Sequence, residues 1–124
     1  MKKNLYDYIK SVRPIASIFF GLTVLASFKI STGKITGDAI WLTLAAVIVF
    51  FAIMAQNDLR DRWHDAKKGK NFVSQNEKPF RQFTIILWFL SIVATILISK
   101  ENLGYACLLS TIILSGLLYS EIRL

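Results

Sequence analysis

Four long apolar stretches, with charged residues only near their ends, limit the folds that this chain can adopt. They cover residues 14–30, 38–57, 82–99 and 103–120. A helix needs about 20 mostly apolar residues to cross the hydrocarbon core of a bilayer. Because lipid cannot pair with backbone polar groups, a spanning segment must be a helix or part of a closed barrel. We therefore expect an all-α integral membrane protein with four transmembrane helices, which form a single transmembrane domain over residues 1–124.

The polar residues before and between these stretches predict how the helices begin. Residues 1–13 mix basic with apolar side chains, which is typical of an amphipathic segment lying at the membrane surface. Arg13-Pro14 ends that segment, because proline suits the first turn of the helix that follows. In the turn before the second stretch, Asp38 is expected to be the N-cap of the next helix.

The distribution of lysine and arginine predicts the orientation of the chain in the membrane. Of the 15 basic residues, four lie in residues 1–13, seven in residues 57–82 and one in the C-terminal tail, whereas only Lys29, Lys34 and Lys100 belong to the opposite side. We expect a multi-pass protein of the cell's inner membrane, with the N-terminus, the 57–82 loop and the C-terminus in the cytoplasm. Topology and lipid head groups then explain the net charge of +7, so the lipid bilayer is the expected partner and a nucleic acid is not.

No charged residue lies in the middle of an apolar stretch. Ion and drug transporters bury an ionisable group at membrane depth, so a small multidrug-type transporter is disfavoured. Chemistry is therefore expected at the cytoplasmic membrane surface, where residues 57–82 form the longest polar segment of the sequence.

Three aspartates open this polar segment at a helical spacing. On a helix, Asp58, Asp61 and Asp65 stand at i, i+3 and i+7, so their carboxylates project from one face. Like charges on one face repel one another unless a cation lies between them, and Mg²⁺ prefers a few carboxylates together with phosphate oxygens and water. The alternative is a solvated acidic face that neighbouring basic residues such as Arg60 and Arg62 neutralise.

The same loop is rich in cations that suit phosphate oxygens. Lys78 and Arg81 flank Pro79-Phe80 shortly before the third apolar stretch. Carboxylates that hold Mg²⁺, together with lysine and arginine side chains that contact phosphate directly, form a composition typical of a diphosphate site. Apolar helices beside the site would shelter a lipid tail, so a prenyl diphosphate is the expected substrate. Taken singly, these cations are also explained as anchors on the cytoplasmic side.

Asn57-Asp58-x-x-Asp61-x-x-x-Asp65 resembles the first aspartate-rich motif, NDxxDxxxD, of the UbiA-type intramembrane prenyltransferases. Arg13-Pro14 and Leu118-Tyr119-Ser120 are similar to weaker signatures of that family. The resemblance implies an Mg²⁺-dependent transfer of a prenyl group from a prenyl diphosphate to an aromatic or lipophilic acceptor. The implied ligands of Mg²⁺, and through it of the diphosphate, are Asn57, Asp58, Asp61 and Asp65, with the three aspartates as catalytic residues. Lys78, which stands where many members have arginine, is expected to bind the diphosphate together with Arg81.

The chain corresponds only to the first part of that family's pattern. Family members have nine helices and a second aspartate-rich motif, and no such motif follows Asp65 here. We therefore expect four helices equivalent to the first part of a nine-helix bundle, and no activity from this chain alone. The expected explanations are a truncated gene product, an expressed fragment, or a half that needs a partner, either a C-terminal half or a second copy of the chain.

Two other classes of protein are weighed against this interpretation. A non-catalytic four-helix membrane protein, or a half-enzyme, would use its charged loop to bind lipid head groups or a partner. Mg²⁺-dependent binding of a prenyl diphosphate distinguishes the two interpretations. A CDP-alcohol phosphotransferase also places aspartates at the end of a span, but the Asp-Gly and Ala-Arg pairs that its pattern requires are absent from the sequence.

Overall fold

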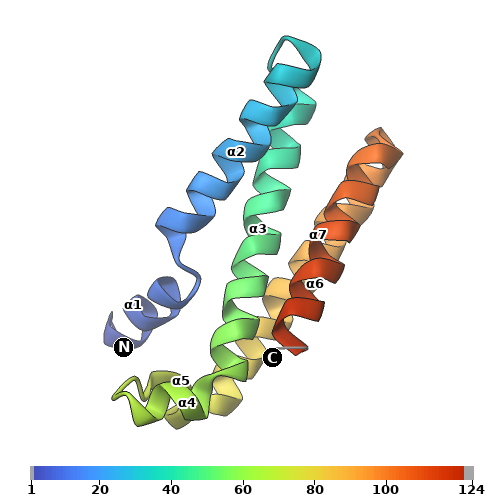
Figure 1. The fold of residues 1–124 in the computed structure, drawn as a ribbon. Helices are drawn as coiled ribbons and strands as arrows, with labels where there is room; N and C mark the ends of the chain where they lie inside the picture. The colour runs from blue at the N-terminus through green and yellow to red at the C-terminus, as the bar shows by residue number, and fades with distance from the viewer. Residues whose placement is uncertain (1, 122–124) are drawn as a thin grey trace.

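The computed structural model of the chain describes residues 2–121 and, of their side chains, those of residues 5–100 and 102–120. Within that range the regular structure is entirely helical (Figure 1). The helices are α1 (Lys2–Ser11), α2 (Pro14–Thr32), α3 (Gly37–Arg60), α4 (Arg62–Lys67), α5 (Phe72–Gln75), α6 (Glu77–Glu101) and α7 (Leu103–Glu121). Four of them, α2, α3, α6 and α7, are long and apolar enough to cross a membrane. The prediction of an all-α chain with four helices of membrane-spanning character is therefore confirmed.

Helix α3 lies at the centre of the arrangement. It packs against α2, α6 and α7, and α6 and α7 also pack against each other. Its contact faces carry small side chains, including the fully buried Ala46 and Ala52. On α7, Gly116 approaches α3 so closely that an added Cβ would overlap the side chain of Ile53. Small residues at these crossings let the helix backbones come close together, which is how apolar helices associate where lipid surrounds them.

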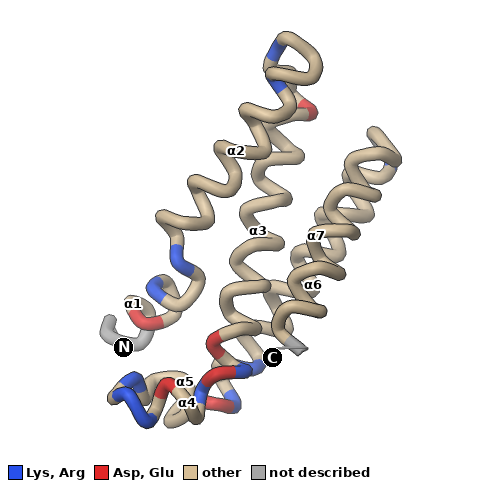
Figure 2. Tube along the Cα trace, in the orientation of Figure 1, with Lys and Arg blue, Asp and Glu red and all other residues tan. Residues whose placement is uncertain are grey.

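The two ends of the molecule differ in polarity. The first helix, α1, and the last turn of α7 lie at the end of the bundle that carries α4 and α5, whereas the α2–α3 and α6–α7 connections lie at the other end (Figure 1). Most charged residues gather at the first of these ends, with a smaller group near the α2–α3 turn, and the middles of the long helices carry none (Figure 2). Large apolar side chains on the outer faces are exposed, as lipid-facing residues of a multi-pass membrane protein would be.

The start of α3 differs from the prediction that Asp38 caps the helix. Thr36 is the N-cap, because its hydroxyl accepts a hydrogen bond from the backbone N–H of Ala39 at 3.4 Å. The helix therefore begins at Gly37 and places Asp38 in its first turn. A negative charge in that turn interacts favourably with the positive end of the helix dipole.

At the end of α2, Gly33 adopts a left-handed conformation with φ of 82° and donates its N–H to the carbonyl of Lys29.

Residues 57–82, expected as a loop, are largely helical. Helix α3 continues to Arg60, α4 and α5 follow, and α6 already begins at Glu77. The backbone ladder crosses the break between α3 and α4, since Asp61 donates its N–H to Asn57 and Asp65 donates its N–H to Asp61, each at 2.9 Å. The aspartate-rich segment therefore keeps a nearly continuous helical path beyond the apolar part of α3.

Candidate functional site

The residues of the aspartate-rich motif are spread along the polar end of α3 and the short helix α4. Asn57 and Asp58 occupy the last turn of α3, Asp61 stands at the break between the helices, and Asp65 belongs to α4. The carboxylates of Asp61 and Asp65 are near enough to repel that of Asp58. The motif thus places Asp58 in the field of two like charges, and groups near Asp58 must offset the repulsion.

Asn57 is buried and ties two long helices together. Its side-chain oxygen, Oδ1, accepts a hydrogen bond of 2.6 Å from the hydroxyl of Ser120, which lies at the end of α7 and is itself fully buried. The two residues are 63 positions apart in the chain. The first residue of the motif therefore acts as a link between α3 and α7 in this structure, and its predicted role as a metal ligand stays a prediction.

Asp58 is held by residues from the N-terminal segment. The hydroxyl of Ser11 donates to Oδ2 of Asp58 at 2.9 Å, and Nη2 of Arg13 lies 3.5 Å from Oδ1. The side chain of Arg13 is 56% exposed and that of Asp58 is 19% exposed, so the carboxylate is the more sheltered partner. One neutral hydroxyl and one cation thus partly offset the repulsion among the aspartates.

An aromatic cluster holds α1 in the position that these contacts require. The ring of Tyr8 lies 5.1 Å from that of Phe72, 5.8 Å from that of Phe80 and 4.9 Å from that of Phe83, measured between centroids. These distances fall in the range where aromatic pairs attract one another beyond simple burial. Helix α1 is therefore packed across the start of α6, with its C-terminal end next to Asp58.

The predicted phosphate-binding cations lie in the first turns of α6. Lys78 is exposed, and Arg81 is 54% exposed but pairs with Glu77 at 2.8 Å. The same carboxylate oxygen of Glu77 lies 3.1 Å from Nη2 of Arg62, the first residue of α4. Glu77 thereby joins the start of α6 to the helix that carries Asp65. Lys78 and Arg81 share the polar end of the molecule with the aspartates, but Arg81 already has an acidic partner there.

The described residues do not form a closed metal cage. Nowhere in that part of the chain do three or more histidine, cysteine, aspartate or glutamate side chains come together in a way that could hold a metal ion. The donors of the motif are nevertheless hard oxygens, and Mg²⁺ is commonly held by one or two carboxylates while phosphate oxygens and water complete its shell. The oxygen donors of the motif are therefore of the chemical type that Mg²⁺ accepts together with phosphate oxygens.

Sequence reasoning missed Ser11, and it noticed Arg13 and Ser120 only as parts of short signatures and not as contacts of the motif. The sequence carries no local signal for the two serine hydrogen bonds, because each serine acts on a residue at least 47 positions away. Only the tertiary packing of α1 and α7 reveals them.

Comparison with known proteins identifies the family. A family model described as the UbiA prenyltransferase family matches residues 5–124, which include the whole aspartate-rich motif. No curated protein and no solved structure matches the chain. The family match agrees with the helices long enough to span a membrane and with the polar site at one of their ends. The chain therefore belongs to the UbiA prenyltransferase family.

Proposed function

We propose that this chain carries a diphosphate-binding site of a membrane-bound prenyltransferase, which transfers a prenyl group from a prenyl diphosphate to an aromatic or lipophilic acceptor with the help of Mg²⁺. The observation that supports the proposal best is the NDxxDxxxD motif, which lies at the polar end of a long apolar helix within a chain of this family. We propose that this end of the bundle lies in the cytoplasm, and the distribution of lysine and arginine supports that orientation.

Within this proposal, the carboxylates of Asp58, Asp61 and Asp65 would hold Mg²⁺, and Asn57 would complete the motif. Bound Mg²⁺ would neutralise the diphosphate and so stabilise it as a leaving group. All three aspartates are partly buried, and Asp58 already contacts Ser11 and Arg13. We therefore assign the three carboxylates to the ion together, with Arg13 as the neighbour that the ion would replace at Asp58.

Lys78 and Arg81 would bind the diphosphate oxygens directly. Lys78 is exposed and supplies a point charge, whereas Arg81 would exchange the carboxylate of Glu77 for a phosphate, with which it can form two parallel hydrogen bonds. In the reaction, the bond between the prenyl carbon and the diphosphate oxygen breaks, and its electron pair leaves with the diphosphate. The acceptor then supplies the electron pair of the new bond and loses a proton. Apolar helices beside the site would exclude water from the allylic cation.

We further propose that residues 1–124 bind a prenyl diphosphate but do not complete the reaction unaided. The family's pattern includes a second aspartate-rich motif, and residues 66–124 contain no aspartate at all. Glu77 is the one glutamate in this range whose side chain the structure describes, and it already forms ion pairs with Arg62 and Arg81. Turnover would therefore need a second acidic motif from a partner chain or a C-terminal half.

Binding of a prenyl diphosphate to the full 124-residue chain in nanodiscs, measured by titration calorimetry with and without Mg²⁺, tests the proposal. Asp61→Asn removes one charge from the motif, and Asp38→Asn makes the same change at the opposite end of α3. We expect Mg²⁺-dependent binding by the unchanged chain, a loss of at least about tenfold in Asp61→Asn, since charge-assisted contacts are the strong ones, and no loss in Asp38→Asn.

Binding that ignores Mg²⁺, or equal binding by both variants, would contradict the assignment. In that case the non-catalytic interpretation, in which the charged segment contacts head groups or a partner, would account better for the molecule. When a partner chain or a C-terminal half supplies the second aspartate-rich motif, Asp61→Asn should abolish prenyl transfer.

A further inference from the structure

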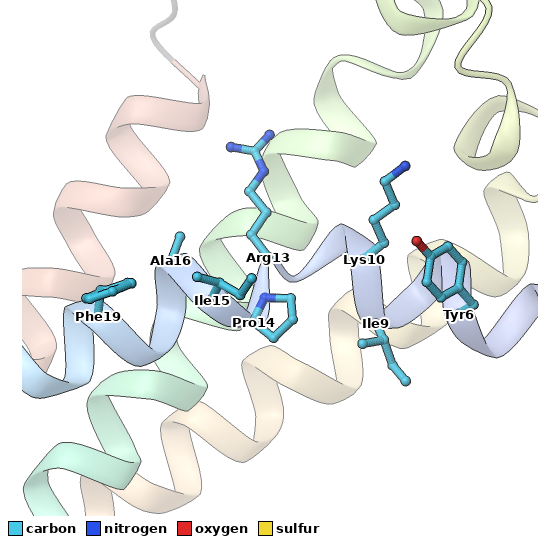
Figure 3. Close-up of a pocket in the computed structure, with 8 residues that line it drawn as sticks. All are labelled: Tyr6, Ile9, Lys10, Arg13, Pro14, Ile15, Ala16 and Phe19. Atoms are coloured by element: carbon cyan, nitrogen blue, oxygen red, sulfur yellow. The ribbon is translucent and has the colours of Figure 1, made fainter.

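The chain bends sharply between α1 and α2, and the bend leaves a hollow on the surface. Arg13 adopts a left-handed conformation with φ of 50° and ψ of 65°, which is uncommon for a residue other than glycine. The hydroxyl of Ser17 donates to the carbonyl of Val12 at 2.8 Å and so braces the bend from the side of α2. The hollow has a volume of about 710 Å³ and is lined by Tyr6, Ile9, Lys10, Arg13, Pro14, Ile15, Ala16 and Phe19 (Figure 3).

Two cations and an apolar wall make up this lining. Lys10 and Arg13 extend to the same side of the bend, whereas Ile9 and Pro14 lie on the other side (Figure 3). Lys10 forms no ion pair with any side chain that the structure describes, and the single ion pair of Arg13, with Asp58, is long at 3.5 Å. Both cations therefore have donors available for an anion.

The apolar wall continues along the outer face of α2. Ile15, Ile18, Phe19 and Leu22 are spaced i, i+3, i+4 and i+7 and so form one stripe on this helix. Their exposed fractions are 73, 55, 65 and 51%, so the stripe faces away from α3 and is not covered by any described residue. A lipid acyl chain lying on this stripe would run from the polar end of the molecule toward the middle of α2.

The hollow lies where the polar helix α1 meets the apolar helix α2, which is where we expect the boundary between head groups and hydrocarbon. Helix α2 begins its apolar run at Pro14, while α1, with Lys10 in its last turn, remains outside that run. Tyr6 at the rim is a residue type enriched at this boundary. Cations at the polar end of the hollow and an apolar stripe at the other end match the division of an acidic phospholipid into phosphate and acyl chain.

We propose that the bend between α1 and α2 is a binding site for an anionic phospholipid of the surrounding bilayer, with its phosphate between Lys10 and Arg13 and an acyl chain along the stripe of α2. The two positive charges favour a lipid with net negative charge over a zwitterionic one. The apolar stripe favours a lipid over free phosphate. The proposal does not depend on prenyl transfer, because it uses neither the aspartates nor Mg²⁺.

Native mass spectrometry of the full chain, released from micelles that contain equal amounts of phosphatidylglycerol and phosphatidylcholine, measures which lipid is retained. The variant is Lys10→Gln, which removes a lining charge without touching Asp58, and the control is Lys67→Gln, an exposed lysine of the same molecular end outside the hollow. Arg13 is left unchanged because it also contacts Asp58. Circular dichroism of Lys10→Gln and Lys67→Gln checks that these substitutions of exposed residues leave the helices intact.

We expect the unchanged chain and Lys67→Gln to retain phosphatidylglycerol in preference to phosphatidylcholine. Lys10→Gln should retain about fivefold less phosphatidylglycerol, the effect of one basic residue at an anionic membrane surface. Equal losses in the two variants would mean that only the overall charge attracts the lipid, and would overturn the proposal. So would equal retention of the two lipids by the unchanged chain, or displacement of the lipid by an excess of inorganic phosphate.

Discussion

The buried hydrogen bond between Ser120 and Asn57 offers the sharpest test of how the site is held together. We expect Ser120→Ala to destabilise the folded bundle, because the substitution removes the donor and leaves the amide oxygen of Asn57 without its partner. Ser120 is fully buried, Asn57 is 5% exposed, and the bond length is 2.6 Å. Water cannot readily replace the lost hydroxyl in such a place.

The size of the effect follows from two limits. A buried polar group that loses its partner costs about 1–3 kcal/mol in proteins in general. Interhelical hydrogen bonds in membranes contribute about 0.6 kcal/mol on average and about 1.7 kcal/mol at most, because the unfolded chain in lipid also finds partners. For a short bond between two buried side chains we expect a coupling at the upper end of the membrane range, about 1–1.5 kcal/mol.

Unfolding of the chain in mixed micelles by increasing sodium dodecyl sulfate, followed by circular dichroism, measures this coupling. A double-mutant cycle combines Ser120→Ala with Asn57→Ala, and Ser115→Ala serves as the control because this serine is exposed on the same helix. The control should leave the free energy of unfolding within about 0.5 kcal/mol of the unchanged chain. A coupling near zero would refute the conclusion that Asn57 links α3 to α7.

Two further predictions concern packing. In the same micelle assay, Gly116→Ala should lower the free energy of unfolding by about 1–3 kcal/mol, because the new Cβ would overlap the buried side chain of Ile53. The control is Gly37→Ala, whose new Cβ would have nothing within 4 Å. This variant should be as stable as the unchanged chain or slightly more stable. Equal stability of the two variants would contradict the close approach of α7 and α3. Tyr8→Ala should increase the rate of amide hydrogen exchange in α1 by about tenfold, because it removes several aromatic contacts that each contribute about 0.5–1.5 kcal/mol. Tyr6→Ala, on the same helix, should change the exchange rate little because Tyr6 is 62% exposed. Similar exchange in both tyrosine variants would show that the cluster does not hold α1.

The long helices could be predicted from the sequence because their cause is local. A run of apolar residues of the right length demands a helix in lipid, whatever it packs against. The amphipathic character of the segment before Pro14 is equally local, and α1 forms there. The choice of Thr36 over Asp38 as N-cap was missed, because both residues are good caps and only the hydrogen bond to Ala39 decides between them.

The arrangement around the motif could not be predicted in the same way. The spacing of the aspartates indicated a shared helical face, and in the structure the charges of Asp61 and Asp65 act on Asp58. The neighbours of Asp58 and Asn57, however, come from α1 and α7, and their choice depends on how these helices pack. Small polar residues such as serine occur throughout the apolar helices, where most bond their own backbone, so nothing in the sequence shows that Ser11 and Ser120 bond to the motif instead.

The contacts of Asp58 determine what a ligand would have to displace. Each carboxylate oxygen has two lone pairs, so the oxygen that accepts the Ser11 hydrogen bond could still take part in another contact. The contact with Arg13, at 3.5 Å, is well beyond the roughly 2.7–2.9 Å of a strong charge-assisted hydrogen bond, and the arginine is the more exposed partner. A cation approaching Asp58 would therefore displace Arg13 first and leave the Ser11 hydrogen bond in place. Helix α1, held by Ser11 and by the aromatic contacts of Tyr8, would stay docked on the site while Arg13, in the bend that follows this helix, moves away.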